Sequence, residues 1–196
     1  VNCTYSGSTG TRTLSHGSMS GTVSNAVSFN VSAGSDTVTY FAASIFLNLD
    51  FTGFTGTLSN AAHSVCGNYK FVSGMTVSSG ASTITFNGSS GTQKLTSAGL
   101  TLDFPITQNN LGSILQLQDN LTIGSTRAFT LTSGTVDVFG KTLTLGTFTN
   151  TGTGTRSITF NSGTIVVSGS GSTAWNASGS GYTSSGSGTI RLTSSS

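Results

Sequence analysis

Charge is the scarcest property of this sequence. Its 196 residues include seven Lys or Arg and five acidic residues, all of them Asp, so only 6% of the chain is charged. Glu and Lys are good helix formers, and their scarcity predicts almost no helix. Nucleic-acid binding needs a clustered basic surface, and we expect no such partner because the basic residues stand singly. They are Arg12, Lys70, Lys94, Arg127, Lys141, Arg156 and Arg191.

Long apolar runs and cysteines are also scarce. No stretch approaches the ~18 apolar residues of a membrane-spanning helix, and we expect no membrane segment. No signal peptide is visible, and a chain that opens at Val1 without Met suggests a processed N-terminus or a longer polypeptide. Cys3 and Cys66 permit one disulfide or stand as two buried thiols. Their spacing matches no metal-binding motif.

Ser, Thr and Gly dominate the sequence instead. Twelve Phe and many Val, Ile and Leu accompany them, which argues against a disordered chain. Thr and Ser suit the solvent side of a strand whose other side is buried. The composition therefore predicts an all-β protein of short strands.

One phrase recurs four times, over residues 70–77, 94–102, 130–138 and 159–167. Each copy has an apolar residue, small polar residues, a glycine and then a strand-like stretch. The apolar residues are Phe71, Leu95, Leu131 and Phe160, and the glycines are Gly74, Gly99, Gly134 and Gly163. Repeats of this length indicate solenoids or propellers.

The repeat favours a single-chain parallel β-solenoid with short turns, or rungs, over the alternative of a β-sandwich. The positions of the four glycines predict rungs of unequal length, roughly 25 to 35 residues each. Stacking would place the four apolar residues in one interior column, with the glycines at corners. We expect residues 1–26 to be a lead-in or cap and residues 27–196 to be the solenoid, with a degenerate Ser/Gly-rich final rung at 168–196.

Two local features refine this prediction. Alternation places Ile45, Leu47, Leu49 and Phe51 on one side of a strand and Phe46 on the other. Pro105 cannot donate a hydrogen bond to a strand ladder, so it must lie at a rung corner, an edge or a bulge.

The segments 82–95, 121–145 and 157–168 resemble the repeats of parallel β-helix proteins. Such repeats occur in tail fibres and tailspikes of tailed bacteriophages and in bacterial surface adhesins. The resemblance covers most of residues 27–192. It implies an extracellular or virion-surface protein, and catalytic tailspikes in this group carry clustered acidic residues in a groove.

Catalytic chemistry finds little support in the sequence. Glycoside cleavage needs two nearby carboxylates, and only Asp103 and Asp137 follow equivalent phrases. No further acid or His joins them. His16 and His63 lie in polar segments without a nucleophile motif. We expect no catalytic residue, no cofactor and no metal site.

The outer surface and the strand edges remain as sites of function. Open strand edges invite pairing with another chain, which predicts a homo-oligomer or a head-to-tail assembly. Aromatic residues could pack between chains or inside the core; they are Phe46, Phe54, Tyr69, Phe139 and Trp175. We expect a non-enzymatic structural or adhesive β-helix of a phage fibre or surface appendage, with host-surface glycans as candidate ligands. The alternatives are a polysaccharide-degrading tailspike-like enzyme and a self-assembling extracellular filament subunit.

Overall fold

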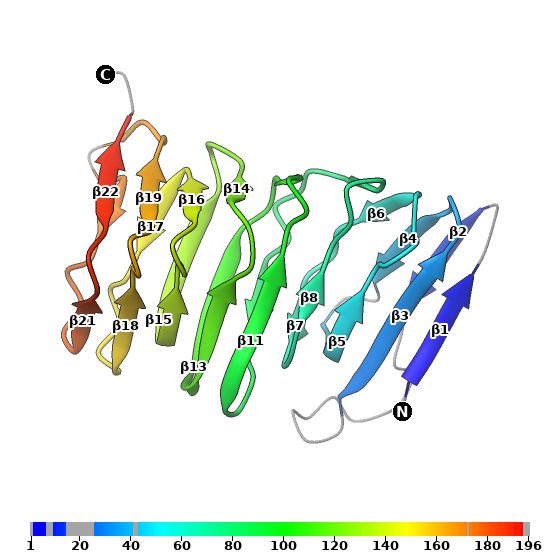
Figure 1. The fold of residues 1–196 in the computed structure, drawn as a ribbon, viewed down its shortest axis with the longest axis horizontal. Helices are drawn as coiled ribbons and strands as arrows, with labels where there is room; N and C mark the ends of the chain where they lie inside the picture. Colours follow the sequence, from blue (N-terminus) through cyan, green and yellow to red (C-terminus); the bar gives the residue numbers. More distant parts are fainter. Residues whose placement is uncertain (1, 7–9, 15–25, 41–42, 172, 194–196) are drawn as a thin grey trace.

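The chain forms a parallel β-solenoid of about eight turns (Figure 1). The computed structural model describes residues 2–6, 10–14, 26–40, 43–171 and 173–193. These residues contain no helix, and every strand pair among them is parallel, as the sequence predicted. Antiparallel hairpins of a sandwich are therefore excluded for this part of the chain.

Three sheets run along the solenoid. Two of the three sides of each rung belong to one large sheet, which we call sheet A. Its strands are β1 (Asn2–Ser6), β3 (Val27–Ala33), β5 (Ser44–Asp50), β7 (His63–Val65), β8 (Tyr69–Lys70), β10 (Ile84–Phe86), β11 (Gly91–Thr96), β13 (Ile106–Leu117), β15 (Ala128–Asp137), β17 (Thr147–Thr149), β18 (Arg156–Thr159), β20 (Trp175–Asn176) and β21 (Tyr182–Ser185).

The third side of the rungs carries two shorter sheets. Sheet B contains β2 (Thr11–Leu14), β4 (Thr37–Tyr40), β6 (Thr57–Ser59) and β9 (Thr76–Val77). Sheet C contains β12 (Thr101–Leu102), β14 (Leu121–Ile123), β16 (Thr142–Leu145), β19 (Thr164–Val167) and β22 (Thr189–Leu192). Because β1 and β2 pair with β3 and β4, the solenoid includes strands from the segment expected as a lead-in.

The rungs are shorter than the glycine spacing predicted. The pairs Phe29–Leu49, Leu49–Tyr69, Tyr69–Leu95 and Leu95–Leu117 each advance the chain by one rung, which amounts to about 20 to 26 residues. All five side chains are buried. They form the true interior column of this side of the solenoid.

The predicted column of four apolar residues is only partly correct. Phe71, Leu95, Leu131 and Phe160 are all buried. However, Leu95 pairs with Tyr69 rather than with Phe71, and Leu131 pairs with Gln108 on the neighbouring side of the rung. The sequence around Leu131 resembles the other copies of the phrase but lies at a different corner of the rung. Leu131 therefore does not stack on Leu95.

A recurring turn explains three of the four glycines of the repeated phrase, Gly74, Gly99 and Gly163. The turns 51–54, 72–75, 97–100 and 138–141 each close with a backbone hydrogen bond of 2.9 to 3.2 Å. Gly74 and Gly99 occupy the third position, as Gly140 does in its rung, and Gly163 closes the turn that begins at Phe160. Gly134 lies instead inside β15 with a φ of 84°, where a Cβ would collide with the carbonyl oxygen of Asn110.

The strand β5 corrects the predicted alternation. Ser44, Phe46 and Leu49 are buried, whereas Leu47 is 42% exposed. The strand turns a corner between Phe46 and Leu49, which shifts its inward positions by one residue. Phe46 therefore lies in the core, where its ring contacts the edge of Phe29. Pro105 lies between β12 and β13, at a corner as predicted.

Aromatic rings fill much of the core. Phe54 and Tyr69 are buried, and Trp175 stacks on Phe148 with 4.2 Å between ring centres. Phe139 is 48% exposed. The stack at Trp175 anchors the Ser/Gly-rich last rung to the rung before it, since stacked rings add to the apolar area that is buried.

The disulfide between Cys3 and Cys66 is not formed, because Cys66 is a free, buried thiol. The strand that contains Cys3, β1, is separated from β7 by β3 and β5. Three strand spacings amount to about 14 Å, beyond the ~7 Å that a disulfide spans between Cα atoms. Burial raises the pKa of the Cys66 thiol.

His63 is a buried titratable group in the core. Its Nδ1–H donates to the carbonyl of Ala61 at 2.7 Å, and its ring lies against Tyr40. Burial lowers the pKa of His63 to about 4. The hydroxyls of Tyr40 and Tyr69 share a hydrogen bond of 2.7 Å beside it, and burial raises the pKa of both groups.

We predict that the free energy of unfolding falls as pH drops from about 6.5 towards about 4. In this window the unfolded chain protonates His63 and the folded chain does not. The stability that the neutral His63 contributes is therefore fully present above the window and is lost below it. The expected loss is about 3 kcal/mol. Urea unfolding at several pH values measures it, and His63→Gln should remove most of the slope. An equal slope in both proteins would contradict the prediction.

Candidate functional site

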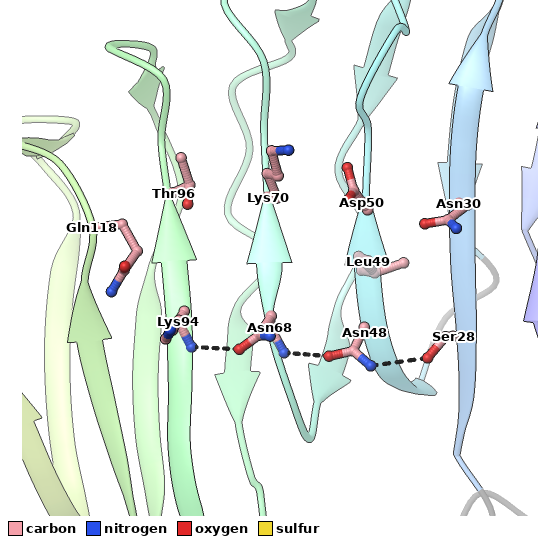
Figure 2. Close-up of a pocket in the computed structure, with 10 residues that line it drawn as sticks. All are labelled: Ser28, Asn30, Asn48, Leu49, Asp50, Asn68, Lys70, Lys94, Thr96 and Gln118. Carbon is pink, nitrogen blue, oxygen red and sulfur yellow. Dashed lines mark hydrogen bonds between the residues drawn. The ribbon is translucent and has the colours of Figure 1, made fainter.

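A polar groove runs along the outer surface of sheet A, over β3, β5, β8 and β11 (Figure 2). Its volume is about 430 Å³. Ten residues from successive rungs line it. They are Ser28, Asn30, Asn48, Leu49, Asp50, Asn68, Lys70, Lys94, Thr96 and Gln118. The groove is built by stacking, because each rung adds one or two outward side chains at the same height.

One side of the groove is a continuous hydrogen-bond ladder. The Asn48 amide donates to the Ser28 hydroxyl at 2.9 Å, and the backbone N–H of Asn68 donates to the Asn48 side-chain oxygen at 2.7 Å. The backbone N–H of Lys94 donates to the Asn68 side-chain oxygen at 2.9 Å. Figure 2 shows these residues in one row. The ladder fixes the amide groups in place.

The second row of the groove adds a carboxylate and a second ammonium group to that of Lys94. Asn30, Asp50, Lys70 and Thr96 are partners in consecutive rungs. Asp50 accepts a hydrogen bond from the backbone N–H of Thr52 at 2.8 Å. A smaller cavity of about 350 Å³, lined in part by Asp50 and Lys70, adjoins the groove. The groove thus offers hydroxyl, amide and ammonium groups and a single carboxylate.

The structure does not bring the two candidate catalytic acids together. Asp103 follows the sheet C strand β12 and pairs with Arg127, whose Nε lies 2.7 Å from the carboxylate. Asp137 ends β15 in sheet A and accepts hydrogen bonds from Gln116, Asn161 and the backbone N–H of Phe139. Neither residue lines the groove.

The other acids also have structural contacts. Asp119 accepts hydrogen bonds from the backbone N–H groups of Ser97 and Ala98, and Asp36 forms an ion pair with Arg12 at 3.6 Å. The corner between sheet A and the third side contains three of these acids, Asp50, Asp119 and Asp137. Their role there is to satisfy backbone N–H groups of the turns.

We predict that Asp137→Ala lowers the free energy of unfolding by about 2 kcal/mol, because three donors lose a charged acceptor. Asp103→Ala is the matched comparison, and it should cost less because the Asp103–Arg127 pair is solvent-exposed in part. Chemical denaturation of both variants measures the difference. A smaller loss for Asp137→Ala than for Asp103→Ala would contradict this account.

Sequence reasoning missed the groove although a signal was present. Ser28, Asn48 and Asn68 recur at equal intervals along the chain, and Asn30, Asp50 and Lys70 recur at the same interval. The glycines of the repeated phrase mark corners, whereas these outward polar positions follow the true rung length. A period of about 20 residues in the polar positions of the segment 28–70 would have found both rows.

Comparison of the chain with protein-family models, with curated proteins and with solved structures finds no match in any of the three. The described residues include no group of three or more potential metal ligands. Within the same residues, no helix is long and apolar enough to cross a lipid bilayer. The structure by itself defines the chain as a β-solenoid.

Proposed function

We propose that the chain is a non-enzymatic, structural and adhesive β-solenoid of a phage fibre or an extracellular surface appendage, and that its polar groove binds a surface glycan. The observation that carries the proposal is the fixed row of amide groups beside Asp50, Lys70 and Lys94. Sugars offer many hydroxyls, and preorganised amides, hydroxyls and ammonium groups can each form one hydrogen bond with them.

The groove favours binding over cleavage. Hydrolysis of a glycosidic bond generally needs a pair of carboxylates about 5 to 10 Å apart, and Asp50 is the single acid among the lining residues. Its carboxylate already caps the turn at Thr52. A groove that extends over several rungs also suits a linear polymer more than a small molecule.

We predict that Lys70→Met weakens binding of a glycan roughly tenfold, because one charged hydrogen bond is lost. A panel of bacterial surface polysaccharides, followed by calorimetric titration of those that bind, measures the effect. Lys141→Met is the control, since Lys141 does not line the groove. Failure of the wild-type protein to bind any member of the panel, or equal affinity of both variants, would refute a glycan site in the groove.

Self-assembly is a second candidate function, which the last described rung favours. Ile165 and Val167 are buried, but their partners in β22, Ile190 and Leu192, are 42% and 62% exposed. An uncovered strand with apolar side chains is a surface for pairing with another strand. We propose that this edge joins copies head to tail.

Light scattering over a range of concentrations tests the assembly. We expect the average mass of the wild-type protein to rise with concentration, and Leu192→Lys to lower it because a charge would enter the apolar contact. A strictly monomeric wild-type protein would exclude this mode of assembly.

A further inference from the structure

The third side of the solenoid is more regular than the other two. The pairings within sheets B and C keep one register from strand to strand. Sheet A instead has register shifts between β1 and β3, β3 and β5, and β13 and β15. Outward side chains of sheets B and C therefore form straight columns.

Threonine fills these columns in sheet B. One column consists of Thr11, Thr37, Thr57 and Thr76, which pair in order across the four strands. The second column, two residues further along each strand, begins with Thr13, Thr39 and Ser59. The residues between the columns in β4 and β6, Val38 and Leu58, are buried, so the hydroxyl side chains point outward.

Sheet C repeats the arrangement. Thr142, Thr164 and Thr189 form one column. Thr101, Thr122 and Thr144 begin the other column, which continues with Val166 and Arg191 in β19 and β22. The inward residues of β16, Leu143 and Leu145, are fully buried. We call the outward Thr and Ser residues of sheets B and C the threonine face.

The hydroxyls of the threonine face have no hydrogen-bond partner within the described residues. Other outward hydroxyls do pair: Thr159 with Ser185 at 3.3 Å, and Ser162 with Ser187 at 3.4 Å. The outward positions of the strands from β4 to β19 on this side also lack charged residues. Water is left to satisfy this ordered array of donors and acceptors.

The spacing of the array is set by the fold. Neighbouring strands lie about 4.8 Å apart, and residues two positions apart along a strand lie about 6.6 Å apart. The spacing between strands is close to the shorter oxygen repeat on a prism plane of hexagonal ice, and the spacing along each strand is somewhat smaller than the longer repeat. Thr is stiff at χ1, so its hydroxyl and methyl groups keep their positions without a large loss of side-chain entropy on binding.

We propose that the threonine face binds ice. The hydroxyls hold a layer of water in near-lattice positions, and the methyl groups between them disfavour a disordered hydration shell. A protein partner would call for aromatic or Arg anchors, and the outward positions of β4 to β16 on this side carry neither. The proposal concerns a different side from the groove, so it does not depend on glycan binding.

The purified 196-residue chain tests the proposal directly. We expect a measurable gap between the melting and freezing temperatures of a seeded ice crystal, faceted crystal growth, and inhibition of ice recrystallisation. Thr57→Tyr and Thr144→Tyr place a bulky ring in the middle of sheets B and C. Their combination should abolish most of the temperature gap, because the ring holds the array away from the ice plane.

The matched control is Thr92→Tyr, an exposed threonine of β11 on sheet A. It should keep wild-type ice activity, and circular dichroism with thermal unfolding shows that each variant is folded. If a variant is unfolded, Thr57→Val and Thr144→Val replace it, since they keep the shape and remove the hydroxyls. A folded wild-type protein without any effect on ice, or one whose effect survives in the folded array variants, would overturn the proposal.

Discussion

The parallel backbone ladder between successive rungs is the interaction on which the rest of this structure depends. A rung of about 20 to 26 residues buries its apolar side chains only when another rung lies beside it. Each strand therefore constrains the next, and residues of one kind gather in columns. Buried Phe, Leu, Ile and Val line the interior from Val27 to Val167.

The corners are where that ladder is interrupted and where polar residues become necessary. At the corner within sheet A, Gln93 donates to the carbonyl of Val65 at 2.8 Å and Gln108 donates to the Ser113 hydroxyl at 2.9 Å. Both glutamines are buried. At the next corner, aspartates bind the N–H groups of the turns. Most acids that a catalytic site would require are thus already engaged in holding the backbone.

The two outer surfaces with proposed functions differ in a way that follows from the columns. In the groove, the column changes identity from Asn30 to Asp50 to Lys70, which gives a chemically varied surface. On the threonine face the outward positions from β4 to β16 keep a hydroxyl side chain, which gives a lattice, and the change to Val166 and Arg191 limits it in β19 and β22. Varied columns suit recognition of a polymer with distinct groups, and uniform columns suit a repeating surface.

The sequence by itself determined the all-β class, the absence of helix in the described residues, the solenoid and the burial of Phe71, Leu95, Leu131 and Phe160. These follow from composition and from local alternation. The rung length, the partner of each strand and the meaning of each glycine were decided only by tertiary structure. Gly134 and Gly99 look alike in the sequence, yet they lie at different corners, because register depends on contacts between residues that are a full rung apart in the chain. The groove and the threonine face could not be recognised before that register was known, since both exist only as columns across rungs.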